Sequence, residues 1–364
     1  MKRVCIFSVY DKDGVVDDAL LFFLDSLKPV LDRLVICVIG FLLEEEKKKL
    51  ERFTKEIFFK ENVGFDAAAI KFILRNYLSL DELKHYDELV IANDTDFGPF
   101  VPFSEIFETM QNKQCDFWGV NLYNCKLMPH IQSDFRVFKR NMFPYFYNYM
   151  MSEISEHETD RFTVASNFEI IFYRKARLAG FKSDAYNTCN YDVYKSTYFA
   201  LIEDKYPFLK ARALSLYDDD ADQYNSALEY VKIHYNYDLR LIVEKVRRKY
   251  NVHIRPMVAK QILCADEEEF INFVDKNKSF YIYGAGNFAR RMYLYYEEYM
   301  SKLKGFVVSN PEQTGTLFGL PIVPFSNVFD LETPMFVALS LKNTEEVSLK
   351  LKDFKNILFL NIER

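Results

Sequence analysis

The sequence predicts an α/β fold in which a mostly parallel sheet is flanked by helices, followed by a second, smaller α/β domain. Short apolar runs alternate with helical segments from residue 4 to residue 97. The runs are continuously apolar, as in parallel strands that are covered on both faces. A strand, a glycine-rich turn and a helix follow one another near residue 280. This second pattern predicts a separate unit of the same class.

Composition excludes several classes of protein. With 364 residues, 49% apolar and 27% charged, the chain is an ordinary globular protein with room for two domains. A net charge of -6 without a basic tract argues against a nucleic-acid partner. The longest apolar run, residues 34–43, is too short to span a bilayer.

The expected location is the cytoplasm. Residues 1–3 lead directly into a strand, so we expect no signal peptide. The six cysteines are scattered and form no CxxC pair. We therefore expect reduced core thiols, without zinc or disulfides.

The first half of the chain alternates strands with helices. The strands are expected at 4–10, 34–39, 56–59 and 89–92, and the helices at 15–27, 44–54 and 67–78. Right-handed crossovers bring the carboxyl ends of such strands to one edge of the sheet, where ligands bind. The residues expected at this edge are Tyr10, Asp13, Gly64, Asp66, Asp94 and Asp96.

Asp94 and Asp96 follow the strand at 89–92 directly. Two carboxylates there can hold a divalent ion that keeps its other positions for water and substrate phosphate. The sequence thus predicts a site for a divalent ion and a diphosphate. The ion can be Mg²⁺ or Mn²⁺, because oxygen ligands do not discriminate between these two metals. The alternative is an Asx-rich turn without a ligand, because Asn and Asp favour turns.

Residues 136–151 combine basic and aromatic side chains. A helix of this composition can lie on a membrane surface. An ordinary core helix, interrupted by Pro144, is the preferred interpretation.

Glu169 has two interpretations. Ser166 followed by Glu169 predicts a capping box at the start of a helix that runs to Leu178. A carboxylate in the first turn that faces the cleft could also take the proton from an acceptor hydroxyl. The sequence leaves both open.

The second domain is expected at residues 263–364, after a first domain at 1–215 and a helical connection at 216–262. Its glycine-rich turn, with Gly284, Gly286 and Ala289, has the context of a dinucleotide fingerprint. An NAD site also needs an acid after the next strand. Ser309 and Asn310 stand there, so we favour a Rossmann-like module with another use over a redox domain.

The first two thirds of the chain resembles the rhamnan synthesis protein F family of bacterial glycosyltransferases. The matching stretches recur in order at residues 10–14, 61–66, 86–89, 93–95, 97–99, 116–119 and 132–133. The resemblance implies a GT-A-like nucleotide-sugar transferase domain, with Asn93 to Asp96 in place of the metal motif. The C-terminal module resembles domains appended to polysaccharide-synthesis enzymes.

The resemblance implies an inverting, metal-dependent transferase that moves a sugar, by the family name rhamnose, from a dTDP-, UDP- or GDP-linked donor to a glycan acceptor. Glu169 would be the base, and the acceptor could be lipid-linked, with peripheral membrane contact. The implied donor side is Ser8, Tyr10, Asp13, Asn62, Gly64, Asp66 and Asn93, and the implied acceptor side is Trp118, Gln132, Ser133 and Asp134. The rivals are a nucleotide-dependent oxidoreductase built on the Gly284 turn and a non-catalytic protein that binds a glycan or a partner.

Overall fold

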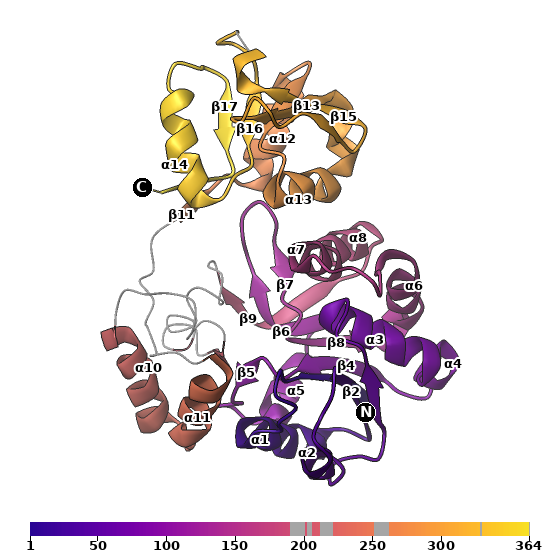
Figure 1. Cartoon of the computed structure of the whole chain (residues 1–364). Helices are drawn as coiled ribbons and strands as arrows, with labels where there is room; N and C mark the ends of the chain where they lie inside the picture. Colours follow the sequence, from indigo (N-terminus) through magenta and orange to yellow (C-terminus); the bar gives the residue numbers. More distant parts are fainter. Residues whose placement is uncertain (190–200, 202–205, 212–220, 251–261, 328–329, 364) are drawn as a thin grey trace. The chain divides into compact units, whose positions relative to one another are not determined.

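The computed structural model describes residues 1–189, 201, 206–211, 221–250, 262–327 and 330–363 (Figure 1). The chain divides into two compact units. The first comprises Met1–Asn124 and His130–Ala259, and the second comprises Cys125–Pro129 and Lys260–Arg364. The helices α10 (Ala221–His234) and α11 (Leu239–Tyr250) belong to the first unit.

The first unit is built on one mixed sheet with the strand order β3-β2-β1-β4-β8-β6-β7, in which β9 also pairs with β6. The first four strands are parallel, β8, β6 and β7 are joined by antiparallel pairing, and β9 is parallel to β6. Their bounds are β1 Arg3–Tyr10, β2 Arg33–Ile39, β3 Ile57–Lys60, β4 Glu88–Asn93, β6 Phe117–Tyr123, β7 His130–Ile131, β8 Phe135–Lys139 and β9 Ser183–Cys189. The short strands β5 (Asp96–Phe97) and β10 (Leu209–Lys210) pair with each other.

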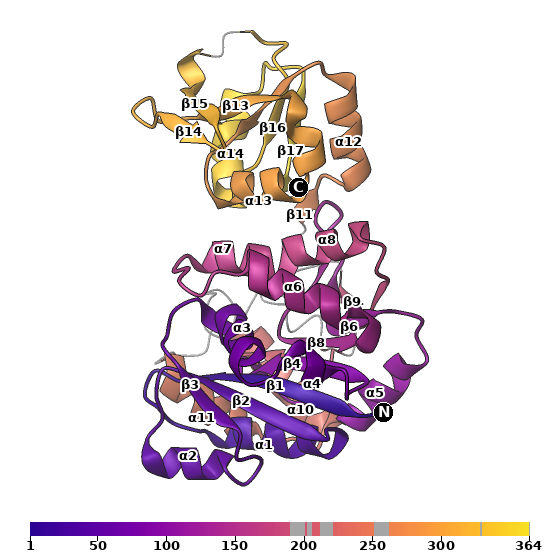
Figure 2. The same cartoon turned by 90° about the vertical axis from the view of Figure 1, so that its right-hand side faces the viewer.

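Helices cover both faces of this sheet (Figure 2). The helices are α1 Asp18–Leu27, α2 Glu44–Leu50, α3 Phe65–Asn76, α4 Leu80–Leu83, α5 Phe103–Gln111, α6 Phe143–Glu153, α7 Arg161–Ala165 and α8 Phe172–Leu178, with 3₁₀ turns at Lys28–Val30 and Arg140–Met142. Phe7 points into a core formed with α1 and α5, whereas its neighbour Ile6 points into a core formed with α3, α6 and α8. Burial on both faces explains the continuous apolar runs and confirms the predicted α/β class with a parallel-rich sheet.

The segment after β6 differs from the predicted helix at 136–151. Two strands, β7 and β8, come first, and the helix begins only at Phe143. Pro144 lies in the first turn of α6, where its missing N–H is not needed, so it does not interrupt the helix. Phe143, Phe146 and Met150 are buried. The core-helix interpretation is therefore confirmed, and Arg136, 1% exposed on β8, cannot reach a membrane surface.

The capping box predicted at Ser166 is wrong. The helix begins at α7, where the carboxylate of Asp160 accepts hydrogen bonds from the N–H groups of Phe162 and Thr163. The Ser166 hydroxyl donates to the carbonyl of Phe162 at 2.6 Å. A π-helix, Ser166–Ile171, then joins α7 to α8 and contains Glu169.

The second unit has a six-stranded sheet with the order β14-β15-β13-β12-β16-β17, parallel except for β14. Its elements are β11 Ile262–Cys264, α12 Glu267–Lys276, β12 Phe280–Tyr283, α13 Asn287–Tyr295, β13 Leu303–Val308, β14 Gly315–Leu317, β15 Leu320–Pro324, β16 Met335–Val337, α14 Leu341–Lys350, β17 Ile357–Phe359 and β18 Asn361–Glu363, with 3₁₀ turns at Glu297–Lys302 and Phe325–Asn327. This is the predicted Rossmann-like arrangement. Throughout the described residues, no helix is long and apolar enough to cross a bilayer.

Candidate functional site

The candidate site lies at the sheet edge where β4 ends and β8 begins. Ala92 pairs with Phe135 across these antiparallel strands. The turn after β4, with Asp94, therefore lies beside the segment before β8, with Ser133. Residues that are distant in sequence meet at this edge.

Asn93 fixes the turn that carries Asp94. Its side-chain NH₂ donates to the Asp66 carboxylate at 3.0 Å, and its side-chain oxygen accepts from the backbone N–H of Thr95 at 3.2 Å. Gly64, with φ +78°, precedes α3, and a Cβ there would lie 2.9 Å from the carbonyl oxygen of Glu156. Asn62 lies exposed in the same loop. Asn93 and Asp66 thus meet at this edge, although β3 and β4 are not neighbours in the sheet.

Four side chains next to this turn form a buried polar cluster. The ammonium of Lys210 lies 3.1 and 3.3 Å from the two carboxylate oxygens of Asp96 and 2.8 Å from Asp134. Tyr206 donates its hydroxyl to Asp134 at 3.0 Å. Burial, against the pull of Lys210, raises the pKa of Asp96 to about 8. Burial also opposes ionisation of Asp134, but the charge of Lys210 and the hydrogen bonds from Lys210, Asp96 and Tyr206 together outweigh it and lower the pKa of this carboxyl.

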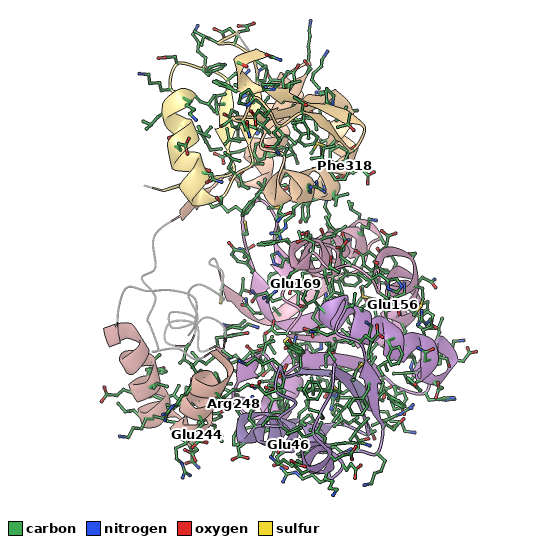
Figure 3. All side chains as sticks on the ribbon, viewed as in Figure 1. Glu46, Glu156, Glu169, Glu244, Arg248 and Phe318 are labelled. Atoms are coloured by element: carbon green, nitrogen blue, oxygen red, sulfur yellow. The ribbon has the colours of Figure 1, made fainter. Side chains whose placement is uncertain are left out.

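Glu169 projects from the π-helix toward the segment before β8 (Figure 3). One of its carboxylate oxygens accepts hydrogen bonds from the backbone N–H of Ser133, at 2.9 Å, and from the Ser133 hydroxyl. The neighbouring Phe168 carbonyl accepts from the guanidinium of Arg136 at 2.9 Å. Arg136 is fully buried over the ring of Phe168, 4.1 Å from its centre, and burial lowers the pKa of Arg136 to about 10. Arg136 therefore holds the turn that presents Glu169 to Ser133.

Two predicted acceptor residues lie deeper. Gln132 is 2% exposed, and its side-chain oxygen accepts from the NH₂ of Asn121 at 2.7 Å. Trp118 is fully buried in the core, with its ring against Phe107. The structure thus brings Ser133 and Asp134 to the site edge, while Trp118 packs the sheet.

The end of β1 carries acids that face α11. Arg248 donates to both carboxylate oxygens of Asp11, at 3.0 and 2.7 Å, and to Asp17 at 3.0 Å. Burial opposes ionisation of Asp11, but the hydrogen bonds from Arg248 and two backbone N–H groups outweigh it and lower its pKa. Lys245 donates to the backbone carbonyl of Asp94 at 3.1 Å. The same helix therefore contacts the β1–α1 loop and the Asp94 turn.

The remaining donor residues predicted on β1 and its loop have different surroundings. Ser8 is buried, and its hydroxyl has no hydrogen-bond partner among the residues that the structure describes. Tyr10 is 37% exposed at the end of β1. The Asp13 carboxylate is half exposed, 3.7 Å from Arg248. Ser8 and Tyr10 lie two residues apart and so on the same face of β1, which is covered at Ser8 and open at Tyr10.

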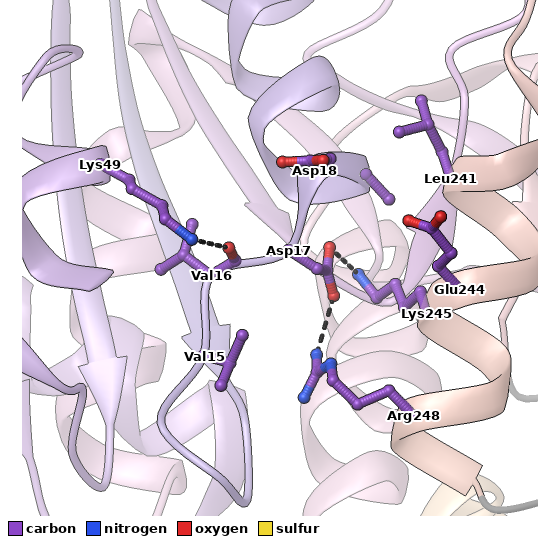
Figure 4. Close-up of a pocket in the computed structure, with 10 residues that line it drawn as sticks. Val15, Val16, Asp17, Asp18, Lys49, Leu241, Glu244, Lys245 and Arg248 are labelled. Carbon is purple, nitrogen blue, oxygen red and sulfur yellow. Dashed lines mark hydrogen bonds and ion pairs between the residues drawn. The ribbon is translucent and has the colours of Figure 1, made fainter. Parts of the chain in front are cut away.

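A pocket of about 230 Å³ opens between the start of α1 and α11 (Figure 4). Asp17 faces both Lys245 and Arg248 there, and Lys49 donates to the carbonyl of Val16. Lys49, Lys245 and Arg248 thus each contact the loop after β1 or the start of α1. The ion pairs of this pocket hold α11 against that loop.

A divalent ion at this site would depend on the carboxylates of Asp94 and Asp96. Within the described ranges, no group of three or more His, Cys, Asp or Glu side chains is arranged to hold an ion. Mg²⁺ is commonly bound through one or two carboxylates together with substrate phosphates. The carboxylates that this mode would use are those of Asp94, 8% exposed in the turn after β4, and Asp96, which contacts Lys210.

Sequence reasoning missed the cations of the site. Lys210 stands in a short strand with no motif around it. Lys245 and Arg248 lie three residues apart on α11, within the predicted helical connection at 216–262, and this spacing places both on one face. That spacing was the one available signal.

The glycine-rich turn of the second unit follows β12. Gly284 has φ +115°, and a Cβ there would lie 2.8 Å from the carbonyl oxygen of Ala338. Gly286 precedes α13, and Ala289 is buried. Ser309, after β13, shares a hydrogen bond of 2.8 Å with the hydroxyl of Tyr283. A hydroxyl pair thus stands where a ribose-binding acid would be expected.

The sequence matches the family model described as Rhamnan synthesis protein F over residues 34–309. This chain belongs to the rhamnan synthesis protein F family. The match runs from β2 through α11 and reaches into the second unit as far as Ser309. No curated protein shows significant similarity to the sequence.

Several solved structures show similarity to this rhamnan synthesis protein F family member. A cytidylyltransferase from Leptospira borgpetersenii has 12% identity and a TM-score of 0.36, over 70% of this chain and 99% of its own. A protein from Desulfovibrio desulfuricans described as a nucleotide-diphospho-sugar transferase has 11% identity and a TM-score of 0.31, over 64% and 97%. Glucosyl-3-phosphoglycerate synthase from Mycobacterium tuberculosis, with Mg²⁺ and UDP, has 13% identity and a TM-score of 0.26, over 38% and 57%. These TM-scores are too low to support an argument about function.

The family and the α/β fold together indicate a nucleotide-sugar transferase.

Proposed function

We propose that this rhamnan synthesis protein F family member is an inverting, metal-dependent glycosyltransferase of the cytoplasm that acts in the synthesis of cell-surface polysaccharide. It would move a sugar from a nucleoside-diphosphate donor to a hydroxyl of a glycan acceptor. The observation that carries this proposal is the meeting of Glu169, held by Ser133, with the Asp94 turn at one edge of the sheet. The family's description supports rhamnose as the sugar.

Glu169 supplies the base in this proposal. Its carboxylate takes the proton of the acceptor hydroxyl while the acceptor oxygen attacks the anomeric carbon. The bond from that carbon to the diphosphate breaks, and the diphosphate leaves with the electron pair, which inverts the anomeric centre. Ser133 holds one carboxylate oxygen of Glu169, so the other can face the acceptor.

Asp94 would hold Mg²⁺ or Mn²⁺, which stabilises the charge of a leaving diphosphate when bound. The donor would lie along the ends of β1, β3 and β4, and the acceptor would lie toward the segment before β8. The proposed donor contacts are Ser8, Tyr10, Asp13, Asn62, Gly64, Asp66 and Asn93. The proposed acceptor contact is Ser133, because Gln132 and Asp134 are buried. A lipid-linked acceptor would place the enzyme at the inner face of the membrane.

Thermal stabilisation by UDP, dTDP and GDP, each with and without Mn²⁺, tests the donor site. We expect one diphosphate to raise the melting temperature only with Mn²⁺, and Asp94→Ala to lose this shift. Asp81→Ala, which changes an exposed carboxylate on α4, is the matched control. Absence of any shift in the wild type would overturn the donor site.

Glu169→Gln tests the base. Turnover with the nucleotide sugar identified above should fall by about 10²–10⁴, the usual contribution of a positioned base. The shift caused by the nucleotide with Mn²⁺ should remain. Glu153→Gln, an exposed change on α6, should keep full turnover. Equal turnover in Glu169→Gln and wild type would remove Glu169 from the mechanism.

The Rossmann-like order of the second sheet supports a second candidate, a nucleotide-dependent oxidoreductase. This candidate predicts binding of NAD or NADP that Gly284→Val abolishes, because a Cβ there meets the Ala338 carbonyl. A fluorescence titration with both dinucleotides decides between the two proposals. If no nucleotide of either kind binds, a non-catalytic binding protein becomes the better proposal.

A further inference from the structure

Arg136 lies in an unusual environment for a charged side chain. It is 1% exposed on β8, and the one hydrogen bond found for its guanidinium among the described residues goes to the carbonyl of Phe168. Its Nε and Nη2 atoms have no hydrogen-bond partner within that part of the chain. Burial of a charge with so few polar contacts costs free energy. Stability alone therefore does not explain an arginine here, because an apolar side chain of similar volume often stabilises a fold as well.

The carbonyl that Arg136 contacts belongs to the π-helix. In a regular α-helix, the N–H of Phe172 would donate to this Phe168 carbonyl, four residues earlier. Here the Phe172 N–H donates to the carbonyls of Asn167 and Glu169 instead. The Arg136 guanidinium donates to the Phe168 carbonyl at 2.9 Å. Arg136 therefore compensates for the change of hydrogen bonding that the π-helix introduces.

Two aromatic rings hold the guanidinium of Arg136 against this turn. The guanidinium lies 4.1 Å from the centre of the Phe168 ring and 5.5 Å from that of the Phe172 ring. Both rings are buried, and cations are attracted to aromatic faces most strongly away from water. Arg136 thus contacts the chain on both sides of Glu169.

The segment that carries Arg136 also contacts Glu169 directly. Ser133 donates its N–H and its hydroxyl to the Glu169 carboxylate. Arg136 pairs with Ile91 of β4, the strand that leads to the Asp94 turn. The position of Glu169 relative to that turn therefore depends on two contacts, that of its own carboxylate and that of the preceding carbonyl.

We propose that Arg136 is a positioning residue for Glu169, because its guanidinium stabilises the π-helix that keeps the Glu169 carboxylate against Ser133. A regular helix has 3.6 residues per turn, so a change of register by one residue would rotate the flanking residues by about 100° and move Glu169 relative to Ser133. The effect on turnover rests on the proposed function. The contact between Arg136 and the π-helix does not.

A double-mutant cycle of turnover tests this inference. Arg136→Met should lower turnover with the nucleotide sugar by about tenfold or more, because small displacements of reacting groups have large effects on rate. The melting-temperature shift caused by the nucleoside diphosphate with Mn²⁺ should remain, because Arg136 lies outside the proposed donor contacts. In the Glu169→Gln background, Arg136→Met should change turnover by less than about twofold, because the group that it positions is no longer a base.

The cycle separates failure of this inference from failure of the proposed function. An equal loss of turnover in both backgrounds would make Arg136 a structural residue only and overturn the inference. Turnover that Glu169→Gln leaves unchanged would overturn the proposed base, and the inference with it. If Arg136→Met does not fold, Arg136→Lys takes its place in the cycle. It keeps the charge without the planar guanidinium, and its loss of turnover should depend on Glu169 in the same way.

Arg3→Met is the matched control. Arg3 lies at the amino end of β1, away from the candidate site, with its side chain 12% exposed and its guanidinium 4.2 Å from the centre of the Phe107 ring. Unlike Arg136, it has a buried carboxylate partner, Glu88, at 2.6 Å. Arg3→Met should therefore lower the urea unfolding midpoint more than Arg136→Met does, and it should leave turnover unchanged. A loss of turnover as large as that of Arg136→Met would show that removal of any buried cation has this effect, which would contradict a specific role for Arg136.

Discussion

On the donor side of the candidate site, individual ion pairs hold the acidic side chains that follow β1. Arg248 reaches the end of β1 from α11 and pairs with the Asp11 and Asp17 carboxylates. Asp11 is 4% exposed, so its negative charge depends on this partner. The lowered pKa of Asp11 reports that dependence.

Arg248→Met should therefore reduce stability in a pH-dependent way. A carboxylate whose folded-state pKa is lowered contributes stability above its unfolded value, near pH 4, and loses that contribution as the pH falls through the folded value. We expect Arg248→Met to lower the free energy of unfolding by about 1.5–3 kcal/mol at pH 7, with a smaller difference below about pH 4. Urea unfolding at several pH values measures both.

Arg240→Met is the matched control for that experiment. Arg240 lies on the same helix, fully exposed, and pairs only locally with Asp238 in the contacts found for it. Arg240→Met should leave the free energy of unfolding almost unchanged at each pH. A loss in Arg248→Met that is independent of pH would contradict the role of Asp11.

At the scale of elements, β6 and the π-helix position the acceptor side. Gly119 lies on β6 opposite Arg136 of β8, the residue that holds the Phe168 carbonyl. The π-helix rotates Glu169 away from the register of a regular helix, and such turns often occur at functional sites. Close packing of β6 against β7 and β8 therefore contributes to the geometry of Glu169.

Gly119→Ala should destabilise the first unit. Its Cβ would lie 2.2 Å from a methyl carbon of Ile131 and 3.0 Å from the Phe135 carbonyl oxygen, which belongs to a paired strand. Overpacking of this kind lowers the free energy of unfolding by about 1–3 kcal/mol. Urea unfolding gives the value. Gly286→Ala, where the Cβ meets nothing within 4 Å, should have a much smaller effect, and equal effects would contradict the packing argument.

At the scale of the whole molecule, two units of the α/β class carry two candidate nucleotide sites. The first has acids and Glu169 at its sheet edge, and the second has the Gly284 turn. Ligand binding stabilises the unit that holds the site by an amount that grows with ligand concentration, about 2.7 kcal/mol at a hundredfold excess over Kd. The location of the stabilisation therefore identifies the site.

Hydrogen exchange with mass spectrometry should locate this effect. With the stabilising nucleoside diphosphate and Mn²⁺, we expect slower exchange in peptides from residues 60–69 and 88–97. Exchange in peptides from residues 280–295 should not change. The reverse pattern would favour the oxidoreductase candidate. Asp94→Ala is the control, because it should remove the protection in the first unit.

The sequence by itself determined the class of fold and the neighbourhood of the site. Continuous apolar runs are set by local composition, so the strands ending at Tyr10 and Asn93 were predicted within a residue. The family resemblance also came from contiguous motifs, and the family model confirms it. Local signals misplaced the start of the Glu169 helix, because Asp160 caps it earlier and a π-helix carries it past Ser166.

Only the tertiary structure decided which charges face one another. Lys210 lies 114 positions from Asp96, and Arg248 lies 237 positions from Asp11. Coulombic pairing depends on distance in space, and no local pattern of residues encodes a contact at such separation. For the same reason, the sequence could propose Asp94 and Asp96 as equal partners, whereas the fold places a buried ammonium against Asp96.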